Sequence, residues 1–455
     1  MSLSKKALLI SAVALLPAFT WAQQQKDSLP RKATMEQCVE YALKNNISVK
    51  QAAEDVSLAK VDKTDAWGAF LPSLSASSGY NYNHGFSFDA NTNQRTTSQQ
   101  QNMSVGVYAQ LNVFNGLRDI NTYRRSQLAH ASKIFSSQKI LNDVSVNVVS
   151  AYISILAALE YKKITVSQWE LSKMQVERIE QLFRSGKKAA GDLYEVQATM
   201  ARDEQAMVDA GNQVELAYLT LKQLLALDLS YELEIETAGY DGIQHSSILN
   251  NSTLDIYSNA VSLLPDIQKA RKDIEMSRKN IAVAKGQFSP TLSLSYGWSN
   301  SFIFDYKNPV TNEPITIGDQ WNNNARQSLG LNLSIPLFNK MSTFSAVRRS
   351  KINFEISKLN LQQAELDLQQ KVEKAYADAT SSYKSYLASV KAAESSREAL
   401  RYATKKFEVG NLNVFDYETA KNLLLKSESD MLRTKYDYIF KTKLLEFYNT
   451  GKIEF

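Results

Sequence analysis

The sequence predicts an α+β membrane protein in which two copies of one unit follow each other along the chain. Three observations lead to this prediction: a set of motifs that occurs twice, strands long enough to cross a bilayer, and long helical stretches without proline. The chain has 455 residues with only 16 Gly and 8 Pro, below the roughly 7% and 5% of average proteins. This composition favours long, uninterrupted elements over a loop-rich fold.

The N-terminus predicts an exported protein. Lys5 and Lys6 precede an apolar run over residues 7–16, and small residues surround a cleavage position after Ala22. The run is too short for a membrane span, which needs about 20 apolar residues. Residues 1–22 are therefore interpreted as a signal peptide that is cleaved on export. A buried N-terminal helix is the alternative interpretation.

Short motifs from the first half of the chain return 218 or 224 residues later. They are Phe-Leu-Pro-Ser at 70–73 with Phe-Ser-Pro-Thr at 288–291, Val-Phe-Asn at 113–115 with Leu-Phe-Asn at 337–339, and Arg-Ser-Gly at 184–186 with Glu-Val-Gly at 408–410. Because the same motifs occur in the same order twice, we expect an internal duplication. The predicted copies are residues 23–240 and 241–455.

Each copy contains two stretches in which apolar and polar residues alternate. They cover residues 74–88 and 105–113 in the first copy, and 292–304 and 329–337 in the second. Such alternation is typical of half-exposed strands, and about 9–11 residues allow a tilted strand to cross a bilayer. The alternate face is almost purely small and polar, which favours membrane strands over the alternative, a soluble β-sandwich. The polar stretches 89–103 and 305–326 are expected to connect the strands.

The remaining sequence predicts long helices. An apolar stripe without proline runs over residues 119–184 and again over 345–409. Gly186 and Gly410 follow at the ends of these stripes, and an aspartate lies six residues after each glycine. Glycine after a helix and aspartate near the next start are usual helix boundaries. Each copy is therefore expected to end in a long antiparallel helical hairpin.

Four membrane strands per chain imply an oligomer. An open sheet edge in lipid leaves unpaired backbone groups that each cost several kcal/mol, and closed barrels need at least about eight strands. One chain cannot close such a barrel, so several copies must share one. Both helical hairpins follow the second strand of their copy, so they are expected to extend from the same side of that barrel.

The composition argues against several other classes of protein. The single Cys38 and three scattered histidines make a cysteine- or histidine-built metal centre unexpected. The formal net charge of +5 is too even a balance to predict nucleic-acid binding. The chain carries no Gly-rich phosphate loop, zinc-protease motif or nucleophile-elbow motif. No enzymatic activity, cofactor or metal is therefore expected.

With these elements in this order, the chain resembles the TolC family of outer-membrane efflux channels. Matching landmarks are Ala-Leu-Lys-Asn-Asn at 42–46, Leu-Pro-Asp-Ile at 264–267, and the Val409-Gly410 turn with Asp416 beyond it. The resemblance covers essentially the whole mature chain. It implies a homotrimer with a twelve-stranded barrel in the outer membrane and a helical tunnel, an α-barrel, across the periplasm.

The resemblance also implies a function. Members of the family conduct substrates passively, while an inner-membrane transporter supplies the energy and a periplasmic adaptor joins the two. Export of proteins by a type I secretion system is the alternative within this class. A periplasmic coiled-coil scaffold or adaptor is the alternative from another class, and it leaves the four alternating strands unexplained.

The resemblance places the periplasmic entrance at the hairpin tips. It implies that Asp416 lines the constriction, where three copies form an acidic ring that attracts cations. Plain helix capping is the alternative interpretation for Asp416 and for Asp192. Phe407 and Leu412 stand where the best-studied family member has a tyrosine and an arginine, so apolar contact rather than a polar lock is expected to close the gate.

The two turns resemble the adaptor-docking tips of the family. They are Ser185-Gly186-Lys187 in the first copy and Val409-Gly410-Asn411 in the second. Ser185 departs from the valine that is usual in the family. Because any helix reversal favours glycine, a purely structural role is the alternative interpretation of both turns.

Overall fold

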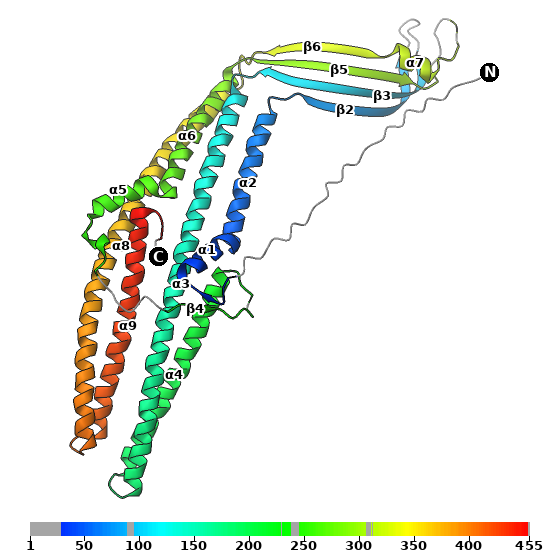
Figure 1. Ribbon diagram of the computed structural model, residues 1–455. Coiled ribbons are helices and arrows are strands. Elements are labelled where there is room, and N and C mark those ends of the chain that lie inside the picture. Colours follow the sequence, from blue (N-terminus) through cyan, green and yellow to red (C-terminus); the bar gives the residue numbers. More distant parts are fainter. Residues whose placement is uncertain are drawn as a thin grey trace.

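A computed structural model of the chain describes residues 29–88, 95–228, 230–237, 245–305, 311 and 313–453. The predicted signal peptide at 1–22 and the predicted boundary between the copies at 240 and 241 lie outside these residues. The molecule is elongated: the long strands extend from one end of a helical bundle, and two helical hairpins form the opposite end (Figure 1).

The same order of six main elements occurs twice. In the first half of the chain they are α1 (Met35–Asn45), α2 (Ile47–Gly68), β2 (Ser73–Phe88), β3 (Arg95–Phe114), α3 (Arg118–Arg184) and α4 (Ala190–Leu224). In the second half they are α5 (Thr253–Leu263), α6 (Pro265–Lys285), β5 (Thr291–Ile303), β6 (Arg326–Ser334), α8 (Ser342–Glu408) and α9 (Val414–Thr450). This order agrees with the two strands and the long helical hairpin expected of each copy, and two helices precede the strands in both halves.

The turn from strand into long helix is built identically in both halves. Leu117 before α3 and Met341 before α8 both adopt the left-handed backbone conformation, with φ of 61° and 66°. The Oδ1 atoms of Asn115 and Asn339 each accept a hydrogen bond from the backbone N–H four residues later, at 3.4 and 3.5 Å. The equivalent positions are 224 residues apart, which is the offset found in the sequence.

The four long strands form one antiparallel sheet in the order β2-β3-β5-β6. In one row across the sheet, Leu74 pairs with Ala109, which pairs with Tyr296, which pairs with Leu329. The next row lies on the opposite face and joins Ser75, Tyr108, Gly297 and Ser328, which are small or carry a hydroxyl group. The apolar face is open to the outside in the single chain, since Leu74 and Leu329 are both 75% exposed.

The bounds of β3 and β6 differ most from the sequence prediction. β3 begins at Arg95, within the stretch 89–103 that was expected to be a loop, because its polar residues pair with the distal half of β2; for example, His84 pairs with Gln99. β6 ends at Ser334 rather than at residue 337, since Pro336 lacks the N–H that a ladder needs. Helix α7 (Ile317–Asn323) lies in the second expected connection.

The two long helices α3 and α8 contain 67 residues each. α3 contains an 18-residue segment that, by its length and composition, is apolar enough to cross a membrane. In the structure 44% of this segment is buried inside the chain. Val148, Ile155 and Leu156 from this region lie in the main core, where α3 meets α1, α4 and a short parallel sheet. That sheet pairs β1 (Lys32–Ala33) with β4 (Glu234–Ile235).

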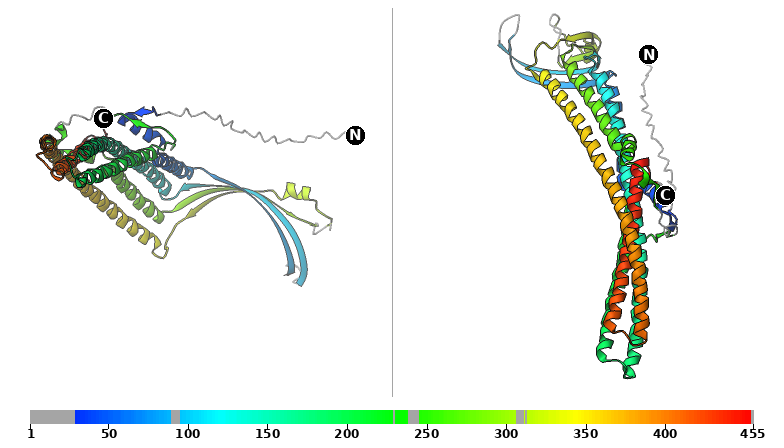
Figure 2. Two further views of the ribbon diagram at one scale, coloured as in Figure 1. Left: turned by 90° about the horizontal axis from the view of Figure 1, so that it is seen from below. Right: turned by 90° about the vertical axis from the view of Figure 1, so that its left-hand side faces the viewer.

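A second core cluster joins α5 and α6 to α8 and α9 in the middle of the molecule. Below it the hairpins α3–α4 and α8–α9 run side by side, and the tip of α3–α4 reaches further (Figure 2). A third, smaller apolar cluster joins the two hairpins close to their tips. The hairpin ends therefore contact each other through a defined interface within one chain.

Candidate functional site

Both hairpin tips have the same backbone geometry. At the end of α3, the N–H of Gly186 donates to the carbonyl of Phe183 and that of Lys187 to Leu182, at 2.9 and 2.8 Å. At the end of α8, the equivalent bonds of Gly410 and Asn411 measure 3.1 and 2.9 Å. This pair of bonds defines a Schellman motif, which needs a residue in the left-handed region. The two glycines supply it, with φ of +74° and +81°.

The helices that leave the tips are not capped by the predicted aspartates. The N-cap of α4 is Ala189, and the N-cap of α9 is Asn413, whose Oδ1 accepts from the backbone N–H of Asp416 at 2.7 Å. Asp192 and Asp416 instead stand in the first helical turn. A negative charge there interacts favourably with the helix dipole. The capping interpretation was therefore wrong in its assignment of the N-cap residue.

The two aspartates have different surroundings. Asp416 is exposed at the tip of the second hairpin. Asp192 is half-buried, and its carboxylate lies 3.4 Å from the Nζ of Lys188 within its own hairpin. Lys188 also lies 5.7 Å above the ring of Phe407, so it links the first tip to the second. In the single chain the charge of Asp416 is open to solvent, while Asp192 pairs with Lys188, the residue that contacts the second hairpin.

Phe407 and Leu412 belong to the apolar cluster between the hairpins. Phe407 is 7% exposed and stacks on Tyr417, with ring centroids 4.9 Å apart. Ile179 of α3 and Val196 of α4 are buried in the same cluster, and Leu412 packs against it. Phe407 and Leu412, at which apolar contact was expected in place of a polar lock, therefore lie in an apolar contact between the two hairpins.

A buried ionic network lies beside this cluster. The Nζ of Lys421 on α9 lies 2.8 Å from a carboxylate oxygen of Asp203 on α4 and 3.5 Å from Glu418 on its own helix. Lys421 also donates to the hydroxyl of Ser172 on α3, which in turn donates to Asp203. The Lys421 side chain is only 1% exposed. Three helices from both hairpins therefore meet at one ammonium group.

Burial affects the acid chemistry of this network. Burial raises the pKa of the Glu418 carboxyl above its ordinary value, and the neighbouring Lys421 opposes this without cancelling it. A buried lysine without a counter-charge is costly, whereas one paired with carboxylates is tolerated. The buried Lys421 therefore needs a carboxylate beside it, and Asp203 is the nearer one.

No sequence motif marks Lys421 or Asp203. A repeat of seven residues on α4 is the sequence feature that could have identified Asp203, since Val196, Asp203 and Ala210 are all buried. A carboxylate at an otherwise apolar position of a helical stripe indicates a buried partner of opposite charge. The sequence alone does not say which of the chain's many lysines is that partner.

A weaker contact joins the hairpins at the surface. Arg178 of α3 lies 3.4 Å from the carboxylate of Glu408 at the end of α8, and both side chains are more than 40% exposed. Exposed ion pairs of this kind contribute about 0–1 kcal/mol. The apolar cluster and the buried network therefore dominate this interface.

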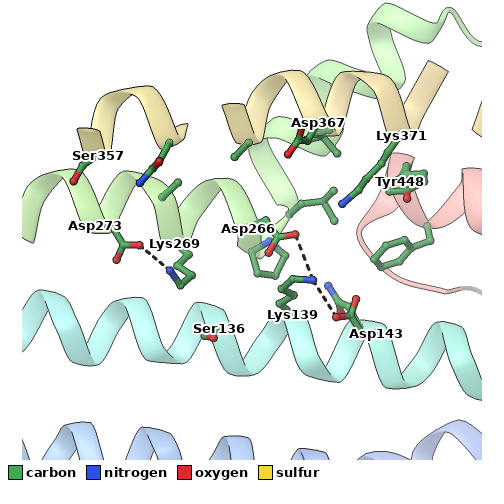
Figure 3. A pocket seen from close by; sticks show the side chains of 18 residues that line it. Ser136, Lys139, Asp143, Asp266, Lys269, Asp273, Ser357, Asp367, Lys371 and Tyr448 are labelled. Atoms are coloured by element: carbon green, nitrogen blue, oxygen red, sulfur yellow. Dashed lines mark hydrogen bonds and ion pairs between the residues drawn. The ribbon is translucent and has the colours of Figure 1, made fainter. Parts of the chain in front are cut away.

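A cavity of about 610 Å³ lies higher up, between α3, α6, α8 and the end of α9 (Figure 3). Lys139 lies 3.0 Å from Asp143 and 3.8 Å from Asp266, and Lys269 lies 2.7 Å from Asp273. Burial lowers the pKa of Lys139, but its bonds to Asp143 and Asp266 outweigh this and leave the pKa raised. Of these three ion pairs, the one between Lys139 and Asp266 joins α3 to α6, close to the end of α9.

The comparisons with known proteins agree with this arrangement. The family model described as outer membrane efflux protein matches residues 38–227 and 256–442, which is well over half of the chain. The outer membrane protein TolC of Vibrio cholerae is 21% identical over 378 residues, or 83% of this chain and 81% of that protein. The alkaline protease secretion protein AprF of Pseudomonas aeruginosa is 21% identical over 421 residues, covering 90% and 82%.

Solved structures share the fold. The CmeC outer membrane channel of Campylobacter jejuni superposes with a TM-score of 0.79 at 18% identity, covering 92% of this chain and 86% of that one. The outer membrane protein VceC of Vibrio cholerae gives a TM-score of 0.76 at 14% identity, covering 92% and 97%.

The family match covers both halves of the chain, and it includes both hairpins and the four-stranded sheet. The scaffold alternative left that sheet unexplained. The chain therefore belongs to the outer membrane efflux protein family and is an outer-membrane exit channel for efflux or secretion rather than an enzyme.

Proposed function

We propose that three copies of the chain share one closed twelve-stranded β-barrel in the outer membrane. The observation that supports this most is the four-stranded sheet, whose apolar face is exposed and whose outer strands β2 and β6 have no strand beside them among the described residues. In lipid, such edges must be paired, and joining β6 of one copy to β2 of the next pairs all of them. The apolar face then contacts outer-membrane lipid.

The helices continue the barrel as a tunnel across the periplasm. Exposed apolar side chains form a stripe on α8 at Ile352, Ile356, Leu359 and Leu366. Intervals of three, four and seven residues place them on one face, as in a helix that packs against another helix. Leu58 and Val61 on α2 are exposed as well. These surfaces support helix packing between copies, and residues 1–22 act as the cleaved export signal.

The hairpin tips form the periplasmic entrance and dock a periplasmic adaptor, which connects the channel to an inner-membrane transporter. Ser185-Gly186-Lys187 and Val409-Gly410-Asn411 are the docking turns. Val409 is 71% exposed and Phe415 is 67% exposed beside the second turn, and exposed apolar groups at a helix end are suited to a protein contact. No nucleic acid is a partner.

The entrance is gated by the contact between hairpins. Phe407 and Leu412 hold the second hairpin against the first. Adaptor binding at the tips shifts the population toward molecules with parted hairpins. The size of this shift is limited by the difference between the adaptor's affinities for the closed and the parted state. Asp416 from three copies forms an acidic ring in the constriction, while Asp192 acts within the hairpin contact. Conduction is passive, for small molecules in efflux or for proteins in type I secretion.

Planar-bilayer recordings test the entrance. The purified protein is expected to conduct and to prefer cations, and Asp416→Asn is expected to reduce that preference by removing the ring. Asp209→Asn, an exposed position on α4, is the control with the same change in net charge. An unchanged preference in Asp416→Asn removes this residue from the pore, and the absence of any conductance contradicts the channel itself.

A further inference from the structure

The outer end of the sheet contains a helix where a strand would continue. β6 begins at Arg326, opposite Ser299, whereas β5 runs on to Ile303. The seven-residue helix α7 (Ile317–Asn323) lies beside this extra length of β5 (Figure 1). α7 therefore occupies the place next to β5 that β6 occupies nearer the helical bundle.

Side-chain amides take over the role of strand hydrogen bonds along this edge. The Nε2 of Gln320 donates to the carbonyl of Ile303 at 2.9 Å, and its Oε1 accepts from the N–H of Ile303 at 2.8 Å. Asn324, just after α7, donates to the carbonyl of Ser301 at 2.7 Å. Gln320 is 3% exposed. The edge of β5 is therefore satisfied by amides where a strand is missing.

Further contacts fix how α7 is rotated about its axis. Asn300 donates to the backbone carbonyl of Trp321 at 2.7 Å. The ring of Trp321 stacks on Phe302, with centroids 5.5 Å apart and planes at 9°. Phe302 belongs to the row of apolar side chains on β5, so Trp321 lies on the apolar face of the sheet. Gln320 points to β5 at the same time.

This rotation determines which residues point away from β5. Successive helical residues are about 100° apart around the axis, so positions 318 and 322 lie about 160–200° from Gln320. Gly318 and Asn322 therefore face the side opposite β5, and both are exposed. On that side nothing lies within 4 Å of a Cβ placed at Gly318 except the hydroxyl of Thr316.

We propose that α7 closes the outer part of the seam between two copies of the chain, with Gly318 and Asn322 against β2 of the partner subunit. This inference rests on the proposed barrel, in which β6 pairs with that β2. β2 has 16 residues and β6 has 9, so part of the β2 edge extends beyond the partner that β6 provides. An unpaired edge at membrane depth is costly.

The chemistry of α7 is suited to that edge. The amide of Asn322 carries both a donor and an acceptor, as Gln320 does on the other side. It bonds the exposed backbone of β2 in the partner subunit in the same way. Gly318 has no side chain, so the strand can approach the helix closely. α7 thus acts as a short spacer between two strand edges, with one amide toward each.

Disulfide cross-linking tests the contact. In a Cys38→Ser background, Asn322→Cys is combined with a second cysteine on β2. This second cysteine is placed at each position from Gly79 to Gly85 in turn, one position per variant. Oxidation in outer-membrane fragments is expected to give linked dimers and trimers for one or two of these positions. One control replaces Asn322→Cys by Asn323→Cys, which lies about 100° away on α7. The other pairs Asn322→Cys with Ser73→Cys near the other end of β2.

The outcomes separate this proposal from the barrel itself. The proposed contact is wrong if native mass spectrometry shows a trimer but no β2 position links to the cysteine at 322. It is also wrong if the controls link equally well. In either case this side of α7 faces lipid instead. If no trimer forms in the parent protein, the proposed barrel fails. As a second measurement, Asn322→Ala is expected to lower the temperature at which the trimer dissociates in SDS, while the neighbouring Asn323→Ala leaves it unchanged.

Discussion

Lys421 of α9 donates a hydrogen bond to Asp203 of α4 across 2.8 Å, in the interface between the two helical hairpins. The side chains are 1% and 8% exposed, so water screens this pair very little. The two residues are 218 positions apart and come from different hairpins. Any movement that parts the hairpins at this level separates a buried ammonium from its carboxylate.

Removing the cation is expected to destabilise the hairpin interface strongly. Lys421→Met leaves the carboxylates of Asp203 and Glu418 buried without a counter-charge, and breaking a buried pair in this way costs about 3–5 kcal/mol. Loss of helical circular dichroism with urea or heat, in detergent, measures the effect. In the bilayer, the same variant is expected to dwell longer in its open state.

The matched variants show whether charge burial is the cause. Replacing the whole network with Lys421→Met, Asp203→Leu and Glu418→Gln together is expected to recover most of the lost stability, because no charge then remains buried. Arg178→Met removes an exposed ion pair between the same hairpins and is expected to cost about 0–1 kcal/mol. Equal effects of Lys421→Met and Arg178→Met would refute the importance of the network.

The pKa of Glu418 predicts a pH dependence. Burial raises the pKa of this carboxyl above its ordinary 4.5. Below that value the group is protonated in folded and unfolded chains alike, so Glu418→Gln changes little. As the pH rises, the unfolded chain ionises first, and the stability contributed by Glu418 falls until the pH passes the folded pKa.

The melting temperature of Glu418→Gln relative to the parent protein is therefore expected to rise from acid to neutral pH and then to level off. Melting curves recorded in steps from about pH 4 to 8 check this. Glu394→Gln, at an exposed position on α8, is the control and is expected to show no such trend. A constant difference across this range, or one of opposite sign, contradicts the role of burial.

The apolar cluster predicts the effect of Phe407→Ala. The side chain is 7% exposed and packs on Tyr417, and truncating a buried phenylalanine to alanine costs about 3–5 kcal/mol. Because the loss falls on the contact between hairpins, longer open times in planar bilayers are expected together with a lower melting temperature. Phe415→Ala removes an exposed ring at the same tip and is expected to change stability by no more than about 0.5 kcal/mol.

The backbone geometry of the hairpin tips predicts that glycine-to-alanine substitutions lower stability at the two turns but not inside α4. Gly410→Ala and Gly186→Ala place a Cβ at φ of +81° and +74°, which costs about 1–2 kcal/mol for an L-residue. Gly191→Ala, inside α4 with nothing within 4 Å of the added Cβ, is expected to be neutral or slightly stabilising. Thermal melting compares the three variants. If the tip variants are as stable as Gly191→Ala, the Schellman turns are not needed to hold the tips.

Much of the architecture could be predicted because it follows from local chemistry. Glycine after a long apolar stripe marks each hairpin turn, and both turns form at the predicted glycines. Alternation marks the strands wherever one face is apolar. It failed at the start of β3, where neighbouring residues such as Gln99 and Gln100 make both faces polar, so the period of two cannot be seen.

The sequence by itself determined the repeated order of elements, the period of the helices and of the strands with one apolar face, and the position of both hairpin turns, because these depend on backbone preferences and on neighbours a few residues away. Only the tertiary structure decided which residues form the contact between hairpins and how α7 lies against β5. Lys421 meets Asp203, and Gln320 meets the edge at Ile303, because two surfaces come together in one particular rotation. No local pattern encodes that rotation, since it is set by the packing of whole helices and strands against one another.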